Sequence, residues 1–325
     1  MWSREVEEVF PKSIRNLLSP ISHLDKSRIQ EIRMRIHQPL EICLSAGNVY
    51  LSEASGFTDQ LDKAYVVSST DISQVLQTIS NHSVYAVEEQ LRQGFITIAG
   101  GHRVGVTGKV ALEGGKIRTM QNVTSFNIRI AKQVIGAATA ILPDLYDFIK
   151  KRPYHTLIVS PPQCGKTTLL RDIVRQLSLG NRNLGIPSHK VGVVDERSEL
   201  AGCIHGIPQS DLGMRTDVLD GCPKAEGMML LIRSMSPQII AVDEIGTMTD
   251  AMAIDEVLHA GVCVITTAHA FSLEELMERP IMREMIEKKI FDRYVLLSNM
   301  PKVATVQGIY DRNLLKLSNR RVTVG

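Results

Sequence analysis

The chain has 325 residues, which is enough for two domains of ordinary size. Hydrophobic residues make up 44% and charged residues 22% of the sequence, a balance that is typical of globular proteins and excludes fibrous and intrinsically disordered classes. The formal net charge of +2 at pH 7 gives no electrostatic sign of a dedicated nucleic-acid-binding protein.

The cysteines and the first residues bear on the cellular compartment. The five cysteines are dispersed and none belongs to a CxxC pair, so the sequence predicts neither a disulfide framework nor a zinc knot. Glu5, Glu7 and Glu8 stand where a signal peptide would have a basic and then an apolar stretch. The apolar runs are far shorter than the roughly 18 residues that a membrane-spanning helix requires. We therefore expect a soluble cytoplasmic protein, which is compatible with attachment to a membrane through a partner.

The first part of the chain has the pattern of antiparallel strands with a few helices. Apolar and polar residues alternate over residues 31–50, and a helical period follows over residues 71–79. Residues 94–130 alternate again, in runs that are separated by two Gly-Gly turns. These patterns predict a smaller α+β N-terminal domain over residues 1–135.

The second part has a different pattern, in which short apolar runs alternate with helical segments. The runs begin at Leu157, Val191, Ile239 and Val262, and the helical segments cover residues 166–177, 225–235 and 250–260. Strands buried on both faces and separated by helices indicate an α/β domain with a mainly parallel sheet and ligand chemistry at the carboxyl ends of its strands. We place this domain at residues 136–325, and we expect residues 131–153 to form a helical connection that ends at Pro153.

The segment TLIVSPPQCGKTTLLRDIV places a compact loop between a buried strand and a helix, which is the context of a phosphate-binding P-loop. Backbone amides of such a loop and the helix dipole favour a bound phosphate. Lys166 is expected to neutralise the β- and γ-phosphates of a nucleotide, and the Thr167 hydroxyl to bind Mg²⁺. The nucleotide-binding residues predicted here are Ser160, Pro161, Pro162, Gln163, Cys164, Gly165, Lys166, Thr167 and Thr168.

Two positions of this loop depart from the usual P-loop pattern. Ser160 stands where the first glycine is usual, and Gln163 stands where nucleotide-binding loops usually carry another glycine. If Gln163 adopts a positive φ, that conformation costs on the order of 1 kcal/mol, and its side chain crowds the nucleotide. Pro161 and Pro162 partly offset this cost because they restrict the loop before the nucleotide arrives.

A second motif, PQIIAVDEIG, is an apolar strand that ends in two adjacent carboxylates. Asp243 suits a Walker B role, in which it supports the Mg²⁺ shell together with Thr167. Glu244 suits the polarisation of the water that attacks the γ-phosphate. An isolated Asp-Glu pair after a strand is more often a solvated turn, but a P-loop earlier in the same domain favours the catalytic interpretation.

Polar groups also follow two other predicted strands. VGVVDERSEL ends in Asp195 and Glu196, and VCVITTAHA ends in residues 266–267 and His269. Taken alone, the acidic end of the first of these strands could cap a helix, and His269 could be a packed or exposed side chain. Together, four strands would deliver a lysine, acids and a histidine to one sheet edge, which is how a composite nucleotide site is assembled.

The order of these motifs resembles that of the secretion-type ATPases of type II and type IV secretion and pilus retraction. SPPQCGKTT is similar to their Walker A motif, VVDERSEL to their Asp box, IRSMSPQIIAVDEIG to their Walker B motif and TTAHA to their His box. Over nearly the whole chain, EIRMRI, GGHRVGVTGK, SFNIRIA, DERSEL, GMRTDVLDGCPKAEGM and VDEIG resemble the stage III sporulation protein AA family, the sporulation ATPases.

The resemblance implies a RecA-like P-loop NTPase core and an N-terminal domain that folds over the nucleotide. It implies an ATP- and Mg²⁺-dependent hydrolase that works as a homo-oligomeric ring, most often a hexamer. Asp195 would then lie near the metal, and Glu196 and His269 would tune or sense the γ-phosphate. Arg103 in GGHRVGV and Arg129 in SFNIRIA stand at positions that match arginines directed at the γ-phosphate, although arginines on exposed strands are more often plain surface charges.

The resemblance also implies a task and partners. The protein would power a secretion-like channel between mother cell and forespore, with membrane proteins of that complex as partners and no direct contact with nucleic acid. Two alternatives stay open. The first is a P-loop ATPase that acts on single-stranded nucleic acid, against which stand the low aromatic content of 5% and the near-neutral charge. The second is a nucleotide-binding scaffold whose hydrolysis is impaired by Ser160 and Gln163.

Overall fold

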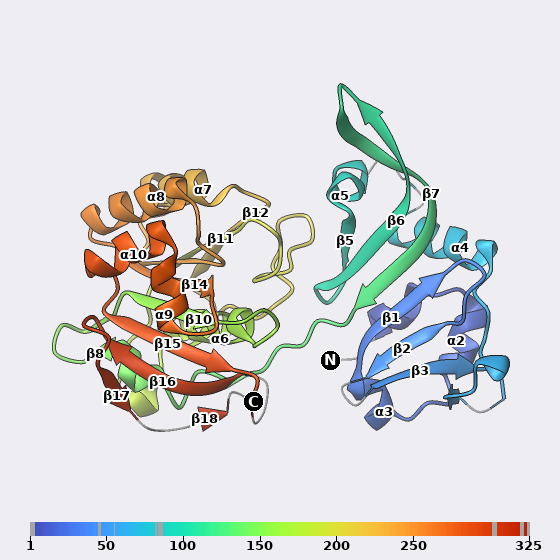
Figure 1. Ribbon diagram of the computed structural model, residues 1–325, viewed down its shortest axis with the longest axis horizontal. Coiled ribbons are helices and arrows are strands. Elements are labelled where there is room, and N and C mark those ends of the chain that lie inside the picture. Colours follow the sequence, from blue (N-terminus) through green and yellow to red (C-terminus); the bar gives the residue numbers. More distant parts are fainter. Residues whose placement is uncertain are drawn as a thin grey trace. The chain divides into compact units, whose positions relative to one another are not determined.

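The chain folds into two compact units, Met1–Lys132 and Gln133–Gly325 (Figure 1). This computed structural model describes residues 4–44, 47–54, 56–81, 83, 87–300, 304–318 and 322–323. The division falls after Lys132, whereas the sequence pattern puts it after residue 135. Each unit has hydrophobic clusters of its own.

Within its described residues, the first unit forms a seven-stranded antiparallel sheet in the order β4-β3-β2-β1-β7-β6-β5. The strands are β1 (Ile29–Arg35), β2 (Glu41–Leu44), β3 (Gly47–Ser52), β4 (Gly56–Thr58), β5 (Phe95–Ile98), β6 (His102–Glu113) and β7 (Lys116–Arg129). The helices are α1 (Arg4–Glu8), α2 (Lys12–Leu18), α3 (His23–Arg28), α4 (Ser69–Ile79) and α5 (Glu88–Gln93), with a 3₁₀ turn η1 (Leu61–Lys63). The predicted antiparallel strands and the helix predicted over residues 71–79 are confirmed.

Alternation of apolar and polar residues explains this sheet. Ile32 and Met34 of β1 are fully buried, while their neighbours along the strand are partly exposed, so one face packs on the core. The helices supply the other side of this core through residues such as Ile14 of α2 and Ile72 of α4. Helix α4 starts with a capping box, in which Ser68 and Asp71 satisfy each other's backbone amides.

The second unit is built on a sheet in the order β12-β11-β13-β14-β10-β15-β16-β17, with β18 also paired to β16. The strands from β12 to β15 are parallel, and β16 to β18 are antiparallel. They are β10 (Thr156–Ser160), β11 (Val191–Asp195), β12 (Thr216–Asp220), β13 (Ile239–Val242), β14 (Cys263–His269), β15 (Arg293–Ser298), β16 (Thr305–Asp311), β17 (Lys316–Ser318) and β18 (Val322–Thr323). Every residue of β10, β11 and β13 is buried, as predicted for strands covered on both faces.

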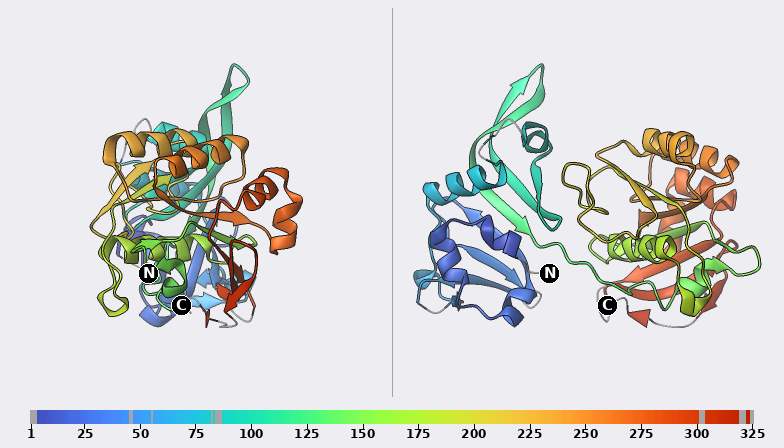
Figure 2. Two further views of the ribbon diagram at one scale, coloured as in Figure 1. Left: turned by 90° about the vertical axis from the view of Figure 1, so that its left-hand side faces the viewer. Right: turned by 180° about the vertical axis from the view of Figure 1, so that it is seen from behind.

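Helices cover both faces of this sheet (Figure 1, Figure 2). Helix α6 (Lys166–Leu179) packs on the face to which Ile158 points, whereas α7 (Lys224–Met235) and α8 (Met248–His259) pack on the opposite face, with Leu157 and Val159. The shorter helices α9 (Leu273–Glu278) and α10 (Pro280–Glu287) join the second of these layers, and η4 (Arg182–Leu184) follows α6. In the part of the chain that the structure describes, we find no helix with the length and apolar character needed to cross a bilayer.

The helical connection predicted over residues 131–153 is wrong. The segment contains turns, the 3₁₀ helix η3 (Leu142–Leu145) and the short strands β8 (Tyr146–Asp147) and β9 (Arg152–Pro153). The amides of Gly136 and Ala138 donate to the carboxylate of Asp172 in α6, at 3.1 and 2.8 Å, in place of helical carbonyls. Gly136 has a φ of 86°, and Pro143 has no amide hydrogen, so the local sequence does not sustain a helix.

Candidate functional site

The loop between β10 and α6 has the backbone shape that the sequence predicts to be costly at Gln163. Gln163 has a φ of 59° and Gly165 a φ of 81°, so both residues are left-handed. The conformation at Gln163 costs on the order of 1 kcal/mol for a residue with a side chain. Gly165 is required for a second reason, because a Cβ atom there would lie 2.6 Å from the Cβ atom of Ala304. Gly165 is the N-cap of α6 and has no side chain that could accept a hydrogen bond from the first amides of the helix.

The amino group of Lys166, at the start of α6, is buried beneath this loop. It donates to the carbonyl oxygens of Ser160 and Pro161, at 3.2 and 3.1 Å, and lies 3.2 Å from Ser160 Oγ. It also lies 2.9 Å from Nδ1 of His269, which comes from the end of β14. Burial lowers the pKa of Lys166. The loop therefore holds the lysine in place before any phosphate arrives.

The contact with Lys166 defines the tautomer of His269. An ammonium group only donates hydrogen bonds, so Nδ1 of His269 accepts, and the ring proton of the neutral imidazole sits on Nε2. Nε2 lies 3.5 Å from Oε1 of Glu244. The histidine thus bridges the P-loop lysine and the glutamate that follows β13.

Asp243, directly after β13, joins the P-loop to β14. Its carboxylate accepts hydrogen bonds from the hydroxyls of Thr167, at 2.7 Å, and Thr267. Strands β13 and β14 are adjacent and parallel, with Val242 opposite Thr266, which brings these side chains to one edge. Hydroxyl and carboxylate oxygens are ligands that suit Mg²⁺, which keeps most of its remaining ligands as water and phosphate oxygens.

Glu244 has a strained backbone and a carboxylate held from two sides. Its φ is 57°, and its amide donates to the hydroxyl of Thr267 at 2.9 Å. Oε2 lies 3.1 Å from Nη1 of Arg197, and Oε1 faces His269. Strain of this kind is uncommon for residues with a side chain and concentrates at functional sites.

Sequence reasoning missed two cations beside Glu244. Arg197 belongs to the same DERSEL segment as Asp195 and Glu196, so its position in that motif could have suggested it. Lys224, the first residue of α7, donates to the carbonyl oxygen of Glu244 at 2.7 Å and pairs with Glu196 at 3.2 Å. The contact of Lys224 with Glu244 could not be predicted from sequence spacing, because Lys224 follows a loop of irregular length.

The acids and cations of these loops surround a small cavity. Its volume is about 20 Å³, and it is lined by Asp195, Glu196, Arg197, Glu199, Lys224, Asp243 and Glu244. A cavity of this size accommodates one water molecule, and its polar lining offers several hydrogen-bond partners. The geometry therefore provides room for water beside the carboxylate of Glu244.

Asp195 is held differently from the other acids of the site. Its buried carboxylate accepts hydrogen bonds from the amides of Glu199, Leu200 and Ala201, at 2.9, 3.0 and 2.7 Å. Burial raises its pKa, while the three amide bonds act in the opposite direction. In the described structure no helix directly follows β11, so Asp195 does not cap one; it fixes the turn at residues 196–201, and its place near a metal stays a prediction.

The two arginines predicted to meet a phosphate lie in the first unit. Arg103 of β6 is directly opposite Arg129 of β7 in the strand register. The guanidinium of Arg103 stacks 3.5 Å from the centre of the Phe95 ring, and Arg129 lies 3.4 Å from Glu31, which reduces the repulsion between the two like charges. The sequence did not predict that they are neighbours, and their role at a phosphate stays a prediction.

Comparison with known proteins assigns the chain to a family. The family model described as sporulation stage III, protein AA, matches residues 2–317. The chain belongs to this family. It is 47% identical over 309 residues to stage III sporulation protein AA of Bacillus subtilis (strain 168), and the match covers 95% of each chain.

Solved structures of secretion-type ATPases share the fold of this family member. The ATPase DotB of Legionella pneumophila has a TM-score of 0.56 and 15% identity, covering 88% of this chain and 76% of its own. The pilus retraction motor PilT, crystallised with ADP, has a TM-score of 0.52 and 12% identity, covering 84% of this chain and 76% of its own. The predicted fold class, a RecA-like P-loop core with a smaller α+β N-terminal domain, is confirmed.

Proposed function

We propose that this member of the sporulation stage III AA family is a Mg²⁺-dependent ATPase. The observation that carries the proposal is the convergence of Lys166, Thr167, Asp243, Glu244 and His269 at one sheet edge. Hydrogen bonds link the lysine to the histidine, and the threonine to the aspartate, so side chains suited to bind phosphate, support a metal and orient water are neighbours, which supports the proposal.

Each of these side chains has a part in the proposed reaction. The loop amides and Lys166 bind the β- and γ-phosphates, whose oxygens replace the carbonyl groups of Ser160 and Pro161 around the ammonium. Thr167 and Asp243 would hold Mg²⁺, which supplies neutralisation of phosphate charge. Glu244 orients the attacking water. His269 loses its lysine donor when Lys166 turns to a phosphate, so the histidine transmits nucleotide binding to Glu244.

Membership of a sporulation family supports a proposal for the cellular task. Hydrolysis would power a secretion-like channel complex during sporulation, between mother cell and forespore, with the protein in the cytoplasm and peripheral at a membrane through partner proteins. A homo-oligomeric ring, in the first instance a hexamer, is the proposed active form. Arg103 and Arg129 are the candidate arginines for the γ-phosphate, and Glu196 would tune the same site through Lys224.

The replacement of Glu244 by glutamine tests the catalytic assignment. Glu244→Gln keeps the shape of the side chain but removes its charge, so kcat should fall by about 10²- to 10⁴-fold while the Kd for Mg²⁺-nucleotide changes little. Phosphate release and isothermal calorimetry on the same preparation measure the two quantities. Glu278→Gln, at an exposed position of α9, is the matched control.

Two results would contradict the proposal at different levels. Unchanged phosphate release from Glu244→Gln would remove this residue from the mechanism but leave the ATPase. Wild-type protein that gives no heat with magnesium nucleotide, and no phosphate release, would remove the ATPase itself.

A nucleotide-binding scaffold with impaired hydrolysis is the second candidate. The observation that favours it is the left-handed backbone of Gln163, a residue with a side chain where such loops usually carry glycine. Tight nucleotide binding without turnover in the wild-type protein, together with a large gain of turnover in the double variant Ser160→Gly, Gln163→Gly, would establish the scaffold. No gain in that variant would indicate a loop adapted to its sequence.

A further inference from the structure

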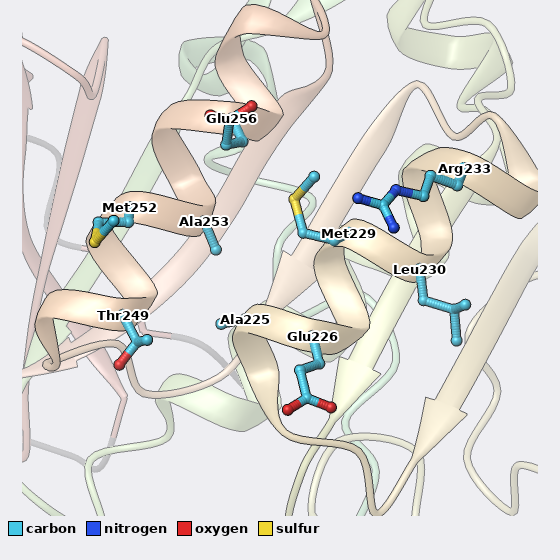
Figure 3. A pocket seen from close by; sticks show the side chains of 9 residues that line it. All are labelled: Ala225, Glu226, Met229, Leu230, Arg233, Thr249, Met252, Ala253 and Glu256. Carbon is cyan, nitrogen blue, oxygen red and sulfur yellow. The ribbon is translucent and has the colours of Figure 1, made fainter.

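An open groove lies on the solvent side of helices α7 and α8 of the second unit, and residues of both helices line it (Figure 3). Its volume is about 630 Å³. Figure 3 shows Met229 of α7 standing between the two helices, with Ala253 on the neighbouring helix α8 beside it. The opposite sides of these helices are buried against the sheet through Met228 and Ile254. The groove is therefore a surface feature of a firmly packed helix pair, and we call it the α7–α8 groove.

The lining of the α7–α8 groove is apolar although it faces solvent. Leu230 is 50% exposed and Met252 is 64% exposed. Two more methionines on the same helices, Met235 and Met248, are 42% and 53% exposed. Methionine side chains adapt to varied partners and concentrate at surfaces that bind helices. Each helix has 12 residues and a length of about 18 Å, so the groove suits about three turns of a partner helix.

The charges at the rim of the groove select the partner's chemistry. Glu226 and Glu256 lie at the rim, and neither forms an ion pair with any residue that the structure describes. Other charges on the same helices are engaged, because Lys224 pairs with Glu196 and Asp250 caps α8. Arg233 is the single cation among the lining residues, which leaves the rim with a net charge of −1. A partner with lysines or arginines beside its apolar side chains complements this rim.

The two helices of the groove also lead directly to the candidate catalytic residues. Lys224 at the start of α7 holds the carbonyl oxygen of Glu244. Helix α8 starts at Met248, four positions after Glu244, with Thr247 as its cap. A ligand between α7 and α8 would therefore press on both elements that fix the backbone of Glu244.

We propose that the α7–α8 groove binds an amphipathic helix of another protein. The apolar side chains of this helix contact Met229 and Met252, and its basic side chains pair with Glu226 and Glu256. This interaction surface goes beyond the proposed ATPase activity and does not depend on it. Binding in the groove is coupled to the nucleotide site through Lys224 and the start of α8.

The test uses the full chain without nucleotide and two labelled model peptides. One is an amphipathic helix of leucines and lysines, and the other is its twin with glutamates in place of the lysines. Fluorescence anisotropy should show the lysine peptide binding at least about tenfold more tightly than the glutamate peptide. The groove variant Leu230→Ser, Met252→Ser should weaken the lysine peptide by about tenfold, and Glu226→Lys, Glu256→Lys should reverse the preference.

Matched controls separate the groove from general surface effects. Met214→Ser removes an apolar side chain that is 83% exposed outside the groove, and Glu278→Lys reverses a charge outside it. Both should bind the lysine peptide like the wild-type protein, and circular dichroism should show all variants folded. Equal binding of the two peptides, or groove variants that bind like these controls, would overturn the proposal.

A third outcome would also overturn it. If the wild-type protein binds neither peptide, and Leu230→Ser, Met252→Ser abolishes self-association in analytical ultracentrifugation, the groove is an interface between copies of this chain. Because the binding assay contains no nucleotide, its failure and a failure of the proposed ATPase activity are separate results.

Discussion

The two units place polar side chains in different ways because their sheets differ. In the second unit the parallel strands β10, β13 and β14 end at the same edge, and the residues that follow them come within hydrogen-bond distance. In the first unit successive antiparallel strands end at opposite edges, and its candidate residues meet only as cross-strand neighbours, as Arg103 and Arg129 do. Strand order therefore predicts which polar side chains meet more reliably in the parallel sheet than in the antiparallel one.

The comparison also concerns how each sheet keeps a polar group buried. The first unit buries His102 at a strand start with a backbone amide as donor, while the second unit has a partly buried network in which the hydroxyls of Thr167 and Thr267 donate to Asp243. The following predictions test this difference, from the largest expected change in stability to the smallest.

His102 should make the first unit sensitive to acid. Its Nδ1 accepts a hydrogen bond from the amide of Ala131 at 2.9 Å, and burial lowers its pKa from 6.5 to about 4. Below pH 6.5 the unfolded chain binds a proton that the folded chain does not, so stability present above pH 6.5 falls as the pH drops toward 4, by up to about 3 kcal/mol. Scanning calorimetry at several pH values measures the loss.

The variant His102→Asn retains an acceptor near the position of Nδ1 and cannot be protonated. Its first unit should lose less stability than the wild type between pH 6.5 and 4. Parallel pH profiles for the two proteins would show that another group governs the acid response.

In the second unit, neighbouring threonines of β14 provide a matched pair. The hydroxyl of Thr267 accepts from the amide of Glu244 and donates to Asp243, whereas the buried hydroxyl of Thr266 has no hydrogen-bond partner among the described residues. Thr267→Val should cost about 1–2 kcal/mol of unfolding free energy, because it leaves the partly buried amide of Glu244 and a carboxylate oxygen of Asp243 without this partner.

Thr266→Val removes a hydroxyl that forms no hydrogen bond within the described structure, so it should be neutral or slightly stabilising. Urea unfolding of both variants gives the difference. An equal loss in the two variants would contradict the network around Asp243.

Gln163→Gly tests the strain in the phosphate loop. Glycine adopts the left-handed conformation without the cost of about 1 kcal/mol, but it also increases the entropy of the unfolded chain. A net stabilisation of about 0.5 kcal/mol should appear in thermal unfolding of the second unit. A destabilised variant would mean that the glutamine side chain makes a favourable contact that exceeds the strain.

Arg129→Gln should have the smallest effect on stability. The side chain is 61% exposed and its ion pair with Glu31 spans 3.4 Å, so the change should stay within about 0.5 kcal/mol. Removal of one charge of the Arg103 and Arg129 pair also relieves repulsion. A loss above about 1 kcal/mol in urea unfolding would show that the contacts of Arg129 stabilise the first unit by more than an exposed ion pair does.

Much of the site could be predicted because local sequence and strand order determine it. The strand, loop and helix around Gly165, and the acids after β13, follow from apolar runs and the Gly-Lys-Thr motif. Arg197 could have been suspected from its place directly after the two acids of the DERSEL segment, whereas Lys224 could not be predicted as a partner of Glu244, because an irregular loop carries it back to the sheet edge. The helical connection failed for a related reason, since the carboxylate of Asp172, distant in sequence, satisfies amides that a helix would have used.

The contact between Gly165 and Ala304 has a consequence for how the phosphate loop is built. Ala304 directly precedes β16 and is 4% exposed, and its methyl group occupies the space that a side chain at position 165 would need. The residue that leads into β16 therefore lies directly against the P-loop at Gly165. Enlarging Ala304 would deform the loop around Gly165, which lies well over a hundred residues earlier in the chain.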